Sequence, residues 1–128
     1  MNKTELLAAI ERLPFNKEDY WVIAGSAMML YDLREETADL DIGVTPRLAD
    51  QLEAEGYPVT RRPDGRRKIE YPGDVDLSEK FLFDRVEMID GIPVISLEGL
   101  LEMKRRLNRP KDQPDIIKLE ERLGIQHA

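Results

Sequence analysis

The chain has 128 residues, of which 41% are hydrophobic and 35% are charged, and its formal net charge is −7. We therefore expect one globular domain, residues 1–128, whose charge argues against tight binding to long nucleic acid. The absence of cysteine excludes disulfides and thiolate metal sites. No apolar stretch is long enough to span a membrane, and residues 1–5 show no signal-peptide core, so a cytoplasmic protein is expected.

The first half of the chain alternates between predicted helices and predicted buried strands. Apolar residues recur at helical spacing near the N-terminus, and Pro14 ends that helix. A turn is expected at Gly25 and Ser26, where Gly25 can adopt a positive φ and Ser26 can cap the next helix. The expected elements are a helix over 4–12, a strand over 20–24, a short helix over 26–33, a strand over 40–44 and a helix over 46–55.

The second half reads as strands joined by tight turns, followed by two helices. The sequences 63–65 (Pro-Asp-Gly) and 90–91 (Asp-Gly) are typical of turns between neighbouring strands. Ser96 is expected to cap a long helix. The expected elements are strands over 59–62, 67–71, 75–77, 86–89 and 92–95, a helix over 96–107, and a last helix that starts at 112 or 113 and ends before Gly124. This α/β (α+β) pattern predicts a mixed β-sheet flanked by helices.

Two carboxylates lie close together at the second predicted strand. Asp39 and Asp41 are two residues apart, so their side chains point to the same face and can reach one metal ion. The Gly25-Ser26 turn would place backbone N–H groups nearby, which suits phosphate. The alternative is an ordinary strand whose polar face lies in water. A carboxylate pair for a hard cation beside an anion-binding turn favours a metal-dependent enzyme that acts on a nucleotide.

These motifs, in this order, resemble the nucleotidyltransferase superfamily of DNA polymerase beta in its small single-domain form. The resemblance rests on 22–26 (Val-Ile-Ala-Gly-Ser), 37–42 (Thr-Ala-Asp-Leu-Asp-Ile) and 75–77 (Val-Asp-Leu), and runs from about 20 to 119. Residues 31–37 also look like bacterial minimal members, which include antibiotic-modifying enzymes and transferases of toxin–antitoxin pairs. The resemblance implies a palm-like sheet with a helical hairpin near the C-terminus.

The resemblance also implies a reaction and a set of partners. A nucleoside monophosphate would pass from a nucleoside triphosphate, with ATP as the first expectation, to a hydroxyl of a small molecule, a protein or an RNA. Mg²⁺, expected as two ions, would be the cofactor. A homodimer or a helical partner protein would complete the acceptor pocket of so small a chain. The alternative is a catalytically inactive module of the same fold that binds a nucleotide or a partner.

The resemblance assigns a role to each residue that matches a motif. Asp39, Asp41 and Asp76 would be the catalytic carboxylates that hold the metal. Asp74, which has the same parity as Asp76 on its strand, and Glu70 remain open as the third carboxylate. The residues expected to contact the nucleotide are Gly25, Ser26, Arg34, Thr37 and Lys104.

Ordinary structural roles are also open for several of these residues. Arg34 could instead pair with a neighbouring carboxylate, and Lys104 could be a surface lysine. Asp115, in the first turn of the last helix, is explained by the helix dipole. Trp21 is expected in the core. A serine–histidine hydrolase is not expected, because the single histidine, His127, is next to the C-terminal residue.

Overall fold

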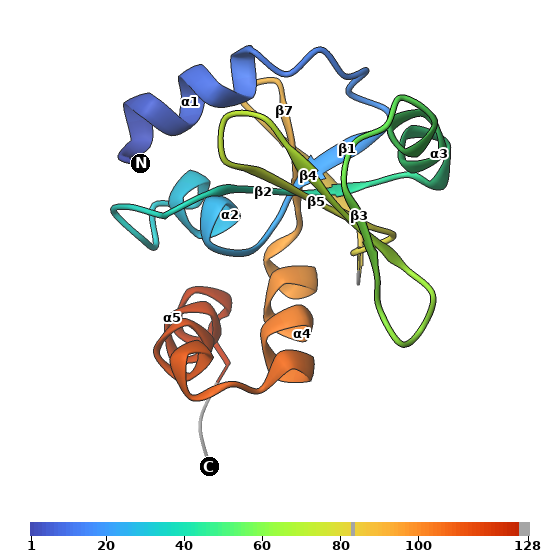
Figure 1. Ribbon diagram of the computed structural model, residues 1–128. Coiled ribbons are helices and arrows are strands. Elements are labelled where there is room, and N and C mark those ends of the chain that lie inside the picture. Colours follow the sequence, from blue (N-terminus) through green and yellow to red (C-terminus); the bar gives the residue numbers. More distant parts are fainter. Residues whose placement is uncertain (83, 126–128) are drawn as a thin grey trace.

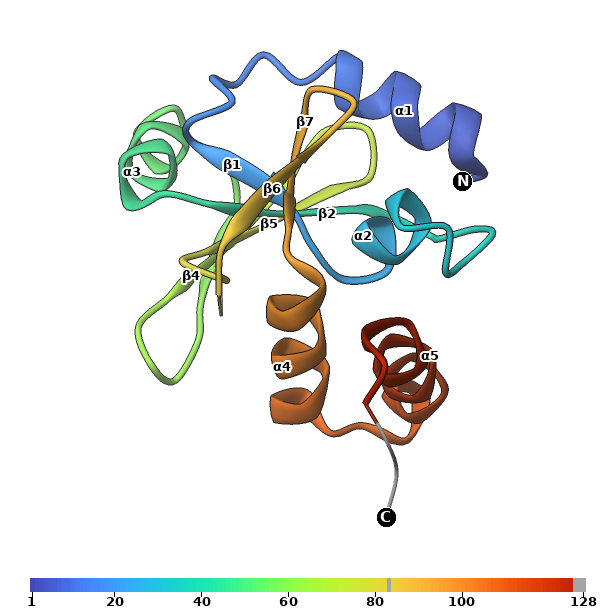
Figure 2. The same ribbon diagram turned by 180° about the vertical axis from the view of Figure 1, so that it is seen from behind.

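The computed structural model describes residues 1–82 and 84–125, so His127 lies outside the described residues. It shows a mixed α+β fold with a seven-stranded sheet (Figures 1 and 2). The helices are α1 (Lys3–Glu11), α2 (Ala24–Leu30), α3 (Pro46–Ala54), α4 (Leu97–Leu107) and α5 (Gln113–Leu123), with a 3₁₀ turn η1 (Pro110–Asp112). The strands are β1 (Tyr20–Val22), β2 (Leu40–Val44), β3 (Val59–Arg61), β4 (Arg67–Tyr71), β5 (Val75–Glu79), β6 (Val86–Ile89) and β7 (Ile92–Ile95).

The strand order in the sheet is β3-β4-β5-β2-β1-β7-β6, and the pairing is mixed. Strand β2 runs parallel to β5 and antiparallel to β1, while β1 runs parallel to β7. The chain between β2 and β5 forms α3 and the antiparallel strands β3 and β4. This crossover places β5 beside β2, and the two strands pair over the whole range 40–44 with 75–79. The pairing explains why β5 extends two residues beyond its predicted end.

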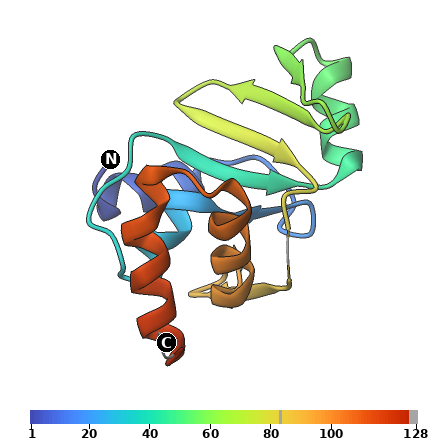
Figure 3. The same ribbon diagram turned by 90° about the horizontal axis from the view of Figure 1, so that it is seen from below.

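The two faces of the sheet carry different side chains. Leu40, Ile42 and Leu77 are fully buried on one face, where α3 packs against β4. The opposite face carries Asp41 and Asp76, because residues alternate between the faces of a strand. Helices α4 and α5 lie side by side at one end of the sheet (Figures 1 and 3). The sheet and this C-terminal helical hairpin confirm the predicted architecture, and they leave the carboxylates facing the space between them.

The start of α2 differs from the prediction. The strand ends at Val22 and the helix already begins at Ala24, so Gly25 and Ser26 lie inside the helix. The positive φ belongs to Ala24, at 55°, and the N-cap is Ile23, whose side chain makes no capping hydrogen bond. The expected turn at Gly25 and cap at Ser26 are therefore wrong. The reason is long-range, because the Ser26 hydroxyl bonds to the next strand instead of to its own helix.

Other local predictions are confirmed. Ser96 caps α4 by accepting a hydrogen bond from the Gly99 N–H at 3.1 Å. Trp21 is 7% exposed and belongs to the core. Its indole lies against Gly43, where any side chain would collide with the ring, and its Nε1–H donates to the Phe81 carbonyl at 2.8 Å. Among the described residues, no helix is long and apolar enough to cross a membrane.

Candidate active site

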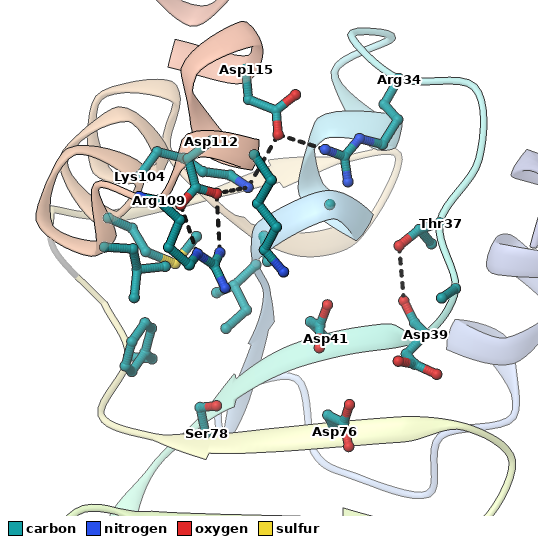
Figure 4. Close-up of a pocket in the computed structure, with 18 of the residues that line it drawn as sticks. Arg34, Thr37, Asp39, Asp41, Asp76, Ser78, Lys104, Arg109, Asp112 and Asp115 are labelled. Atoms are coloured by element: carbon teal, nitrogen blue, oxygen red, sulfur yellow. Dashed lines mark hydrogen bonds and ion pairs between the residues drawn. The ribbon is translucent and has the colours of Figure 1, made fainter. Parts of the chain in front are cut away.

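A cavity of about 850 Å³ lies between the exposed face of β2 and β5 and the C-terminal helices (Figure 4). Its floor carries the carboxylates Asp39, Asp41 and Asp76. Its opposite wall carries the cations Lys104 and Arg109, and Arg34 comes from the segment between α2 and β2. Segments from both ends of the chain therefore meet in one cavity, with acidic groups on one side and basic groups on the other.

The two central carboxylates come from parallel neighbouring strands. Asp41 and Asp76 are directly paired in the β2–β5 register, and adjacent strands are roughly 4.8 Å apart. Within the described residues, neither carboxylate takes part in a hydrogen bond or ion pair of its own. Burial, followed by the charges of Asp76 and Asp39, raises the pKa of Asp41 to about 6, although Lys68 and Lys104 oppose the shift. Negative charge at this position is therefore incompletely compensated by the protein.

The donor set suits a hard divalent cation that is completed by a substrate. Among the described residues, no group of three carboxylates is close enough to form a ready-made metal site. Mg²⁺, however, usually binds one or two protein carboxylates and takes its remaining oxygen ligands from water and substrate phosphates. Asp41 and Asp76, with Asp39 earlier on the β2 segment, fit that requirement. The raised pKa of Asp41 is the sign of a site where a cation would relieve repulsion.

The third carboxylate had two other candidates, Asp74 and Glu70. Asp74 precedes β5 in a left-handed conformation, with φ of 59°, and does not line the cavity. Glu70 pairs with Asp76 across β4 and β5, but it is exposed and also does not line the cavity. The structure therefore places Asp76 beside Asp41, whereas Asp74 and Glu70 lie outside the cavity lining.

Ser26 positions the strand that bears the first two carboxylates. It is fully buried, and its hydroxyl donates to the Asp39 carbonyl at 3.0 Å while accepting from the Asp41 N–H at 3.0 Å. Thr37 adds a longer hydrogen bond from its hydroxyl to the same Asp39 carbonyl, at 3.3 Å. Ser26 is not part of the cavity lining, whereas Thr37 is. The serine thus ties α2 to β2 and holds both aspartates in place.

Gly25 is where Arg34 approaches the backbone of α2. A Cβ at this position would collide with the Arg34 Nη1 and would come within 3.1 Å of the Thr37 hydroxyl. Glycine at position 25 therefore lets the guanidinium lie against the helix and reach Asp115, at 2.5 Å. The structure brings Gly25, Arg34 and Thr37 together at one end of the cavity.

Lys104 is a buried lysine and not a surface residue. It is 4% exposed, and its Nζ lies 3.2 Å from both Asp112 and Asp115. Arg109 binds Asp112 at 2.7 Å, as Figure 4 shows. Burial would raise the pKa of Asp112, but hydrogen bonds from Arg109 and Lys104 outweigh it and lower that pKa to about 2. The cations on this wall are thus held in fixed positions by carboxylates.

The role of Asp115 was missed by the sequence reasoning, which assigned it to the helix dipole. It is 4% exposed and joins Arg34 to Lys104, two residues 70 positions apart in the chain. The available signal was the spacing of Asp112 and Asp115, three residues apart, which places both on one side of a helical segment. A buried carboxylate pair of this kind requires cations from elsewhere in the fold.

The fold is shared with a known structure. The chain resembles the crystal structure of a "putative nucleotidyltransferase (TM1012) from Thermotoga maritima", with a TM-score of 0.64 and 18% sequence identity. The match covers 98% of this chain and 97% of that chain. This protein has a nucleotidyltransferase-like fold. No protein-family model and no curated protein sequence matches it. At this identity the nucleotidyltransferase likeness concerns the fold, so function must be argued from the cavity.

Proposed function

We propose that this protein is a metal-dependent nucleotidyltransferase that moves a nucleoside monophosphate from a nucleoside triphosphate to a hydroxyl. The observation that carries the proposal is the register of Asp41 with Asp76, facing Lys104 and Arg34 across one cavity. Carboxylates suit divalent cations, and fixed cations suit phosphates, so the cavity is arranged for a metal–triphosphate complex. The nucleotidyltransferase-like fold supports the same conclusion.

In this proposal each residue has a defined task. Asp39, Asp41 and Asp76 would hold Mg²⁺, expected as two ions, which would stabilise the negative charge that develops during the transfer. Arg34 and Lys104 face the triphosphate, with the backbone of Gly25 and the hydroxyl of Thr37 beside it. Ser26 serves the site indirectly, through the backbone of Asp39 and Asp41.

The transfer is a substitution at phosphorus and requires no oxidant or reductant. The acceptor oxygen forms a bond to the α-phosphorus of the triphosphate. The bond from that phosphorus to its bridging oxygen breaks, and pyrophosphate leaves with the electron pair. The proton of the acceptor hydroxyl passes to Asp76. Side chains on the opposite wall hold the triphosphate still while this happens, which is the main contribution of proteins to phosphoryl transfer.

We extend the proposal to the setting of the reaction. ATP is the expected donor, and the cytoplasm, where nucleoside triphosphates and Mg²⁺ are abundant, is the expected location. The acceptor class relates the protein to antibiotic-modifying enzymes or to transferases of toxin–antitoxin pairs. A second copy of the chain or a helical partner protein would enclose the acceptor.

A second candidate is a nucleotide-binding module without transfer activity. The observation that favours it is the pairing of Lys104 with Asp112 and Asp115, and of Arg34 with Asp115. These carboxylates already offset part of the positive charge that a triphosphate would use. Binding of a triphosphate without any release of pyrophosphate, over a range of acceptors, would favour the module.

Calorimetric titration with each of the four nucleoside triphosphates in Mg²⁺ tests the proposal. The wild-type protein should bind at least one of them only when the metal is present. Asp41→Asn should weaken that binding at least tenfold, because it removes a metal ligand. Asp74→Asn is the matched control, since Asp74 lies outside the cavity and asparagine tolerates its left-handed conformation. Equal loss in both variants, or metal-independent binding, would contradict the proposal.

A further inference from the structure

A second row of polar side chains lies on the same face of the sheet, one step along the strands from the carboxylates. Ser78 follows Asp76 by two residues on β5 and pairs with Lys68 on β4. Both residues line the cavity. Because side chains on one face of a strand repeat every two residues, the two rows are roughly 7 Å apart. The acidic row and this second row therefore border one continuous space.

Arg62 reaches this second row from the end of β3. Its guanidinium carbon lies 5.0 Å from the centre of the Phe81 ring, and its Nη2 donates to the Ser78 hydroxyl at 3.3 Å. Arg62 and Phe81 both line the cavity. We call Arg62, Lys68, Ser78 and Phe81 the β4–β5 subsite. In Figure 4, Ser78 of this subsite lies on the opposite side of Asp76 from Thr37 and Asp39.

Arg62 is the arginine of this region whose charge the protein leaves unbalanced. Arg61 is paired with Glu53, and Arg67 with Glu79, whereas Arg62 forms no ion pair within the described part of the chain. Its Nε is buried and has no hydrogen-bond partner there. Leaving a buried donor on a charged group unsatisfied is costly, so such a group calls for an explanation. Nε itself is closed to the cavity, but Arg62 lines it, so an anionic ligand there would balance the charge of the guanidinium.

Lys68 adds a second cation to the subsite. It is exposed and forms no ion pair among the described residues. Its charge acts on Asp41, where it opposes the rise in pKa. On the far wall, Lys104, Arg34 and Arg109 are held by Asp112 or Asp115. Lys111 also lines the cavity there and forms no ion pair among the described residues. The cavity thus has two groups of cations, separated by the carboxylates.

We propose that the β4–β5 subsite binds the phosphate group of the acceptor, so that the acceptor is a nucleotide with a free ribose hydroxyl. This inference rests on the proposed function, which places the triphosphate near Arg34 and Lys104. The acceptor hydroxyl lies at the carboxylate row and its phosphate lies at Arg62 and Lys68. The offset between the rows is comparable with the span of one ribose. Guanidinium groups and aromatic rings also stack with bases, which suits Arg62 and Phe81.

Two kinds of molecule carry a phosphate and a free ribose hydroxyl: a free mononucleotide and the end of an RNA strand. The net charge of −7 opposes binding along a strand, so only the terminal nucleotide is expected to enter the cavity. The test uses a fluorescent octaribonucleotide with a free 3′-hydroxyl, with AMP as competitor. Anisotropy is measured in the presence of Mg²⁺ and a non-hydrolysable ATP analogue.

Arg62→Ala should weaken binding of the octanucleotide about tenfold or more, because one charge-assisted phosphate contact is lost. Lys68→Ala should weaken it in the same direction. Arg61→Ala is the matched control, because Arg61 pairs with Glu53 and does not line this cavity. It should stay within twofold of wild type. Arg62→Ala and Arg61→Ala should bind the ATP analogue as wild type does, and thermal unfolding checks that each variant is folded.

Competition with AMP shows whether the acceptor is a free nucleotide or a strand end, and either result supports a phosphate-binding role for the β4–β5 subsite. Displacement by AMP at a comparable concentration indicates a free nucleotide, and displacement by unlabelled RNA alone indicates a strand end. An octanucleotide with a 3′-phosphate should bind more weakly, because its added charge would meet the carboxylates.

Four results would overturn the proposal. The first is an equal loss of affinity for the octanucleotide in the Arg61 and Arg62 variants, and the second is tighter binding of the 3′-phosphorylated strand. The third is that Arg62→Ala no longer binds the ATP analogue. The fourth is a wild-type protein that binds the analogue but neither acceptor. Failure of the wild-type protein to bind any triphosphate with metal would instead refute the proposed function.

Discussion

Replacing Asp41 by Asn should stabilise the protein at pH 8 when no metal is present. Burial and the neighbouring carboxylates raise the pKa of Asp41 from 3.8 to about 6. A tenfold change in a proton-binding constant corresponds to about 1.4 kcal/mol, so ionised Asp41 costs the folded state at most about 3 kcal/mol. We expect a gain of about 1–3 kcal/mol in Asp41→Asn. The ionised carboxylate of Asp41, which destabilises the folded protein without metal, is also the form that would bind a metal ion.

The free energy of unfolding should depend on pH because Asp41 ionises at a higher pH in the folded state than in the unfolded state. Because the folded-state pKa of Asp41 is raised, the folded state binds more protons than the unfolded state between about pH 4 and 6. The contribution of Asp41 to the free energy of unfolding is therefore greatest below about pH 4 and falls as the pH rises through 6. The advantage of Asp41→Asn should be small at pH 4.5 and fully present at pH 8.

Urea unfolding in EDTA, followed by the fluorescence of the buried Trp21, measures this directly. Asp74→Asn serves as the control, because it removes one carboxylate outside the cavity. Added Mg²⁺ should stabilise the wild-type protein and leave Asp41→Asn nearly unchanged. An Asp41→Asn protein that is no more stable than wild type at pH 8, or that shows the same advantage at pH 4.5, would refute the reasoning.

Three further substitutions test the supports of the site. Gly25→Ala should displace the Arg34 guanidinium and weaken triphosphate binding in Mg²⁺ about tenfold; unchanged affinity in a titration would show that this approach is unimportant. Ser26→Ala removes the acceptor of the Asp41 N–H and leaves the Asp39 carbonyl with only the longer hydrogen bond from Thr37, so it should lower the free energy of unfolding by about 1–3 kcal/mol, measured in urea. Asp115→Asn leaves Lys104 with a single carboxylate and should cost about 2 kcal/mol in the same experiment, whereas a loss below about 0.5 kcal/mol would mean that Asp112 alone suffices.

The features that sequence predicted well are those with local causes. The turn at 90–91 and the cap at Ser96 depend on residues within a few positions, and both are found in the structure. The spacing of two residues between Asp39 and Asp41 was expected to bring both to one face; Asp41 lies on β2, Asp39 directly precedes it, and the structure places both in the cavity. Local chemistry therefore accounts for most elements and for the first two carboxylates.

The features that sequence reasoning missed depend on distant partners. Ser26 looked like a cap, but its hydroxyl bonds to the backbone of β2, 13 and 15 residues away. Asp115 looked like a helix-dipole residue until Arg34, 81 residues earlier, was seen to bind it. The buried Nε of Arg62, which has no hydrogen-bond partner among residues 1–82 and 84–125, could not be predicted either, because it depends on how β3 and the segment after β5 pack. Such contacts are properties of the assembled fold.

The most direct test of the central claim is a crystal structure with Mn²⁺ and a non-hydrolysable nucleoside triphosphate. Anomalous scattering locates Mn²⁺ without reference to any assumed ligand. We expect an anomalous peak between Asp41 and Asp76 within reach of Asp39, with the triphosphate lying between that peak and the wall that carries Lys104 and Arg34. A peak elsewhere, or a triphosphate bound outside this cavity, would contradict the assignment of the site and the proposed reaction with it.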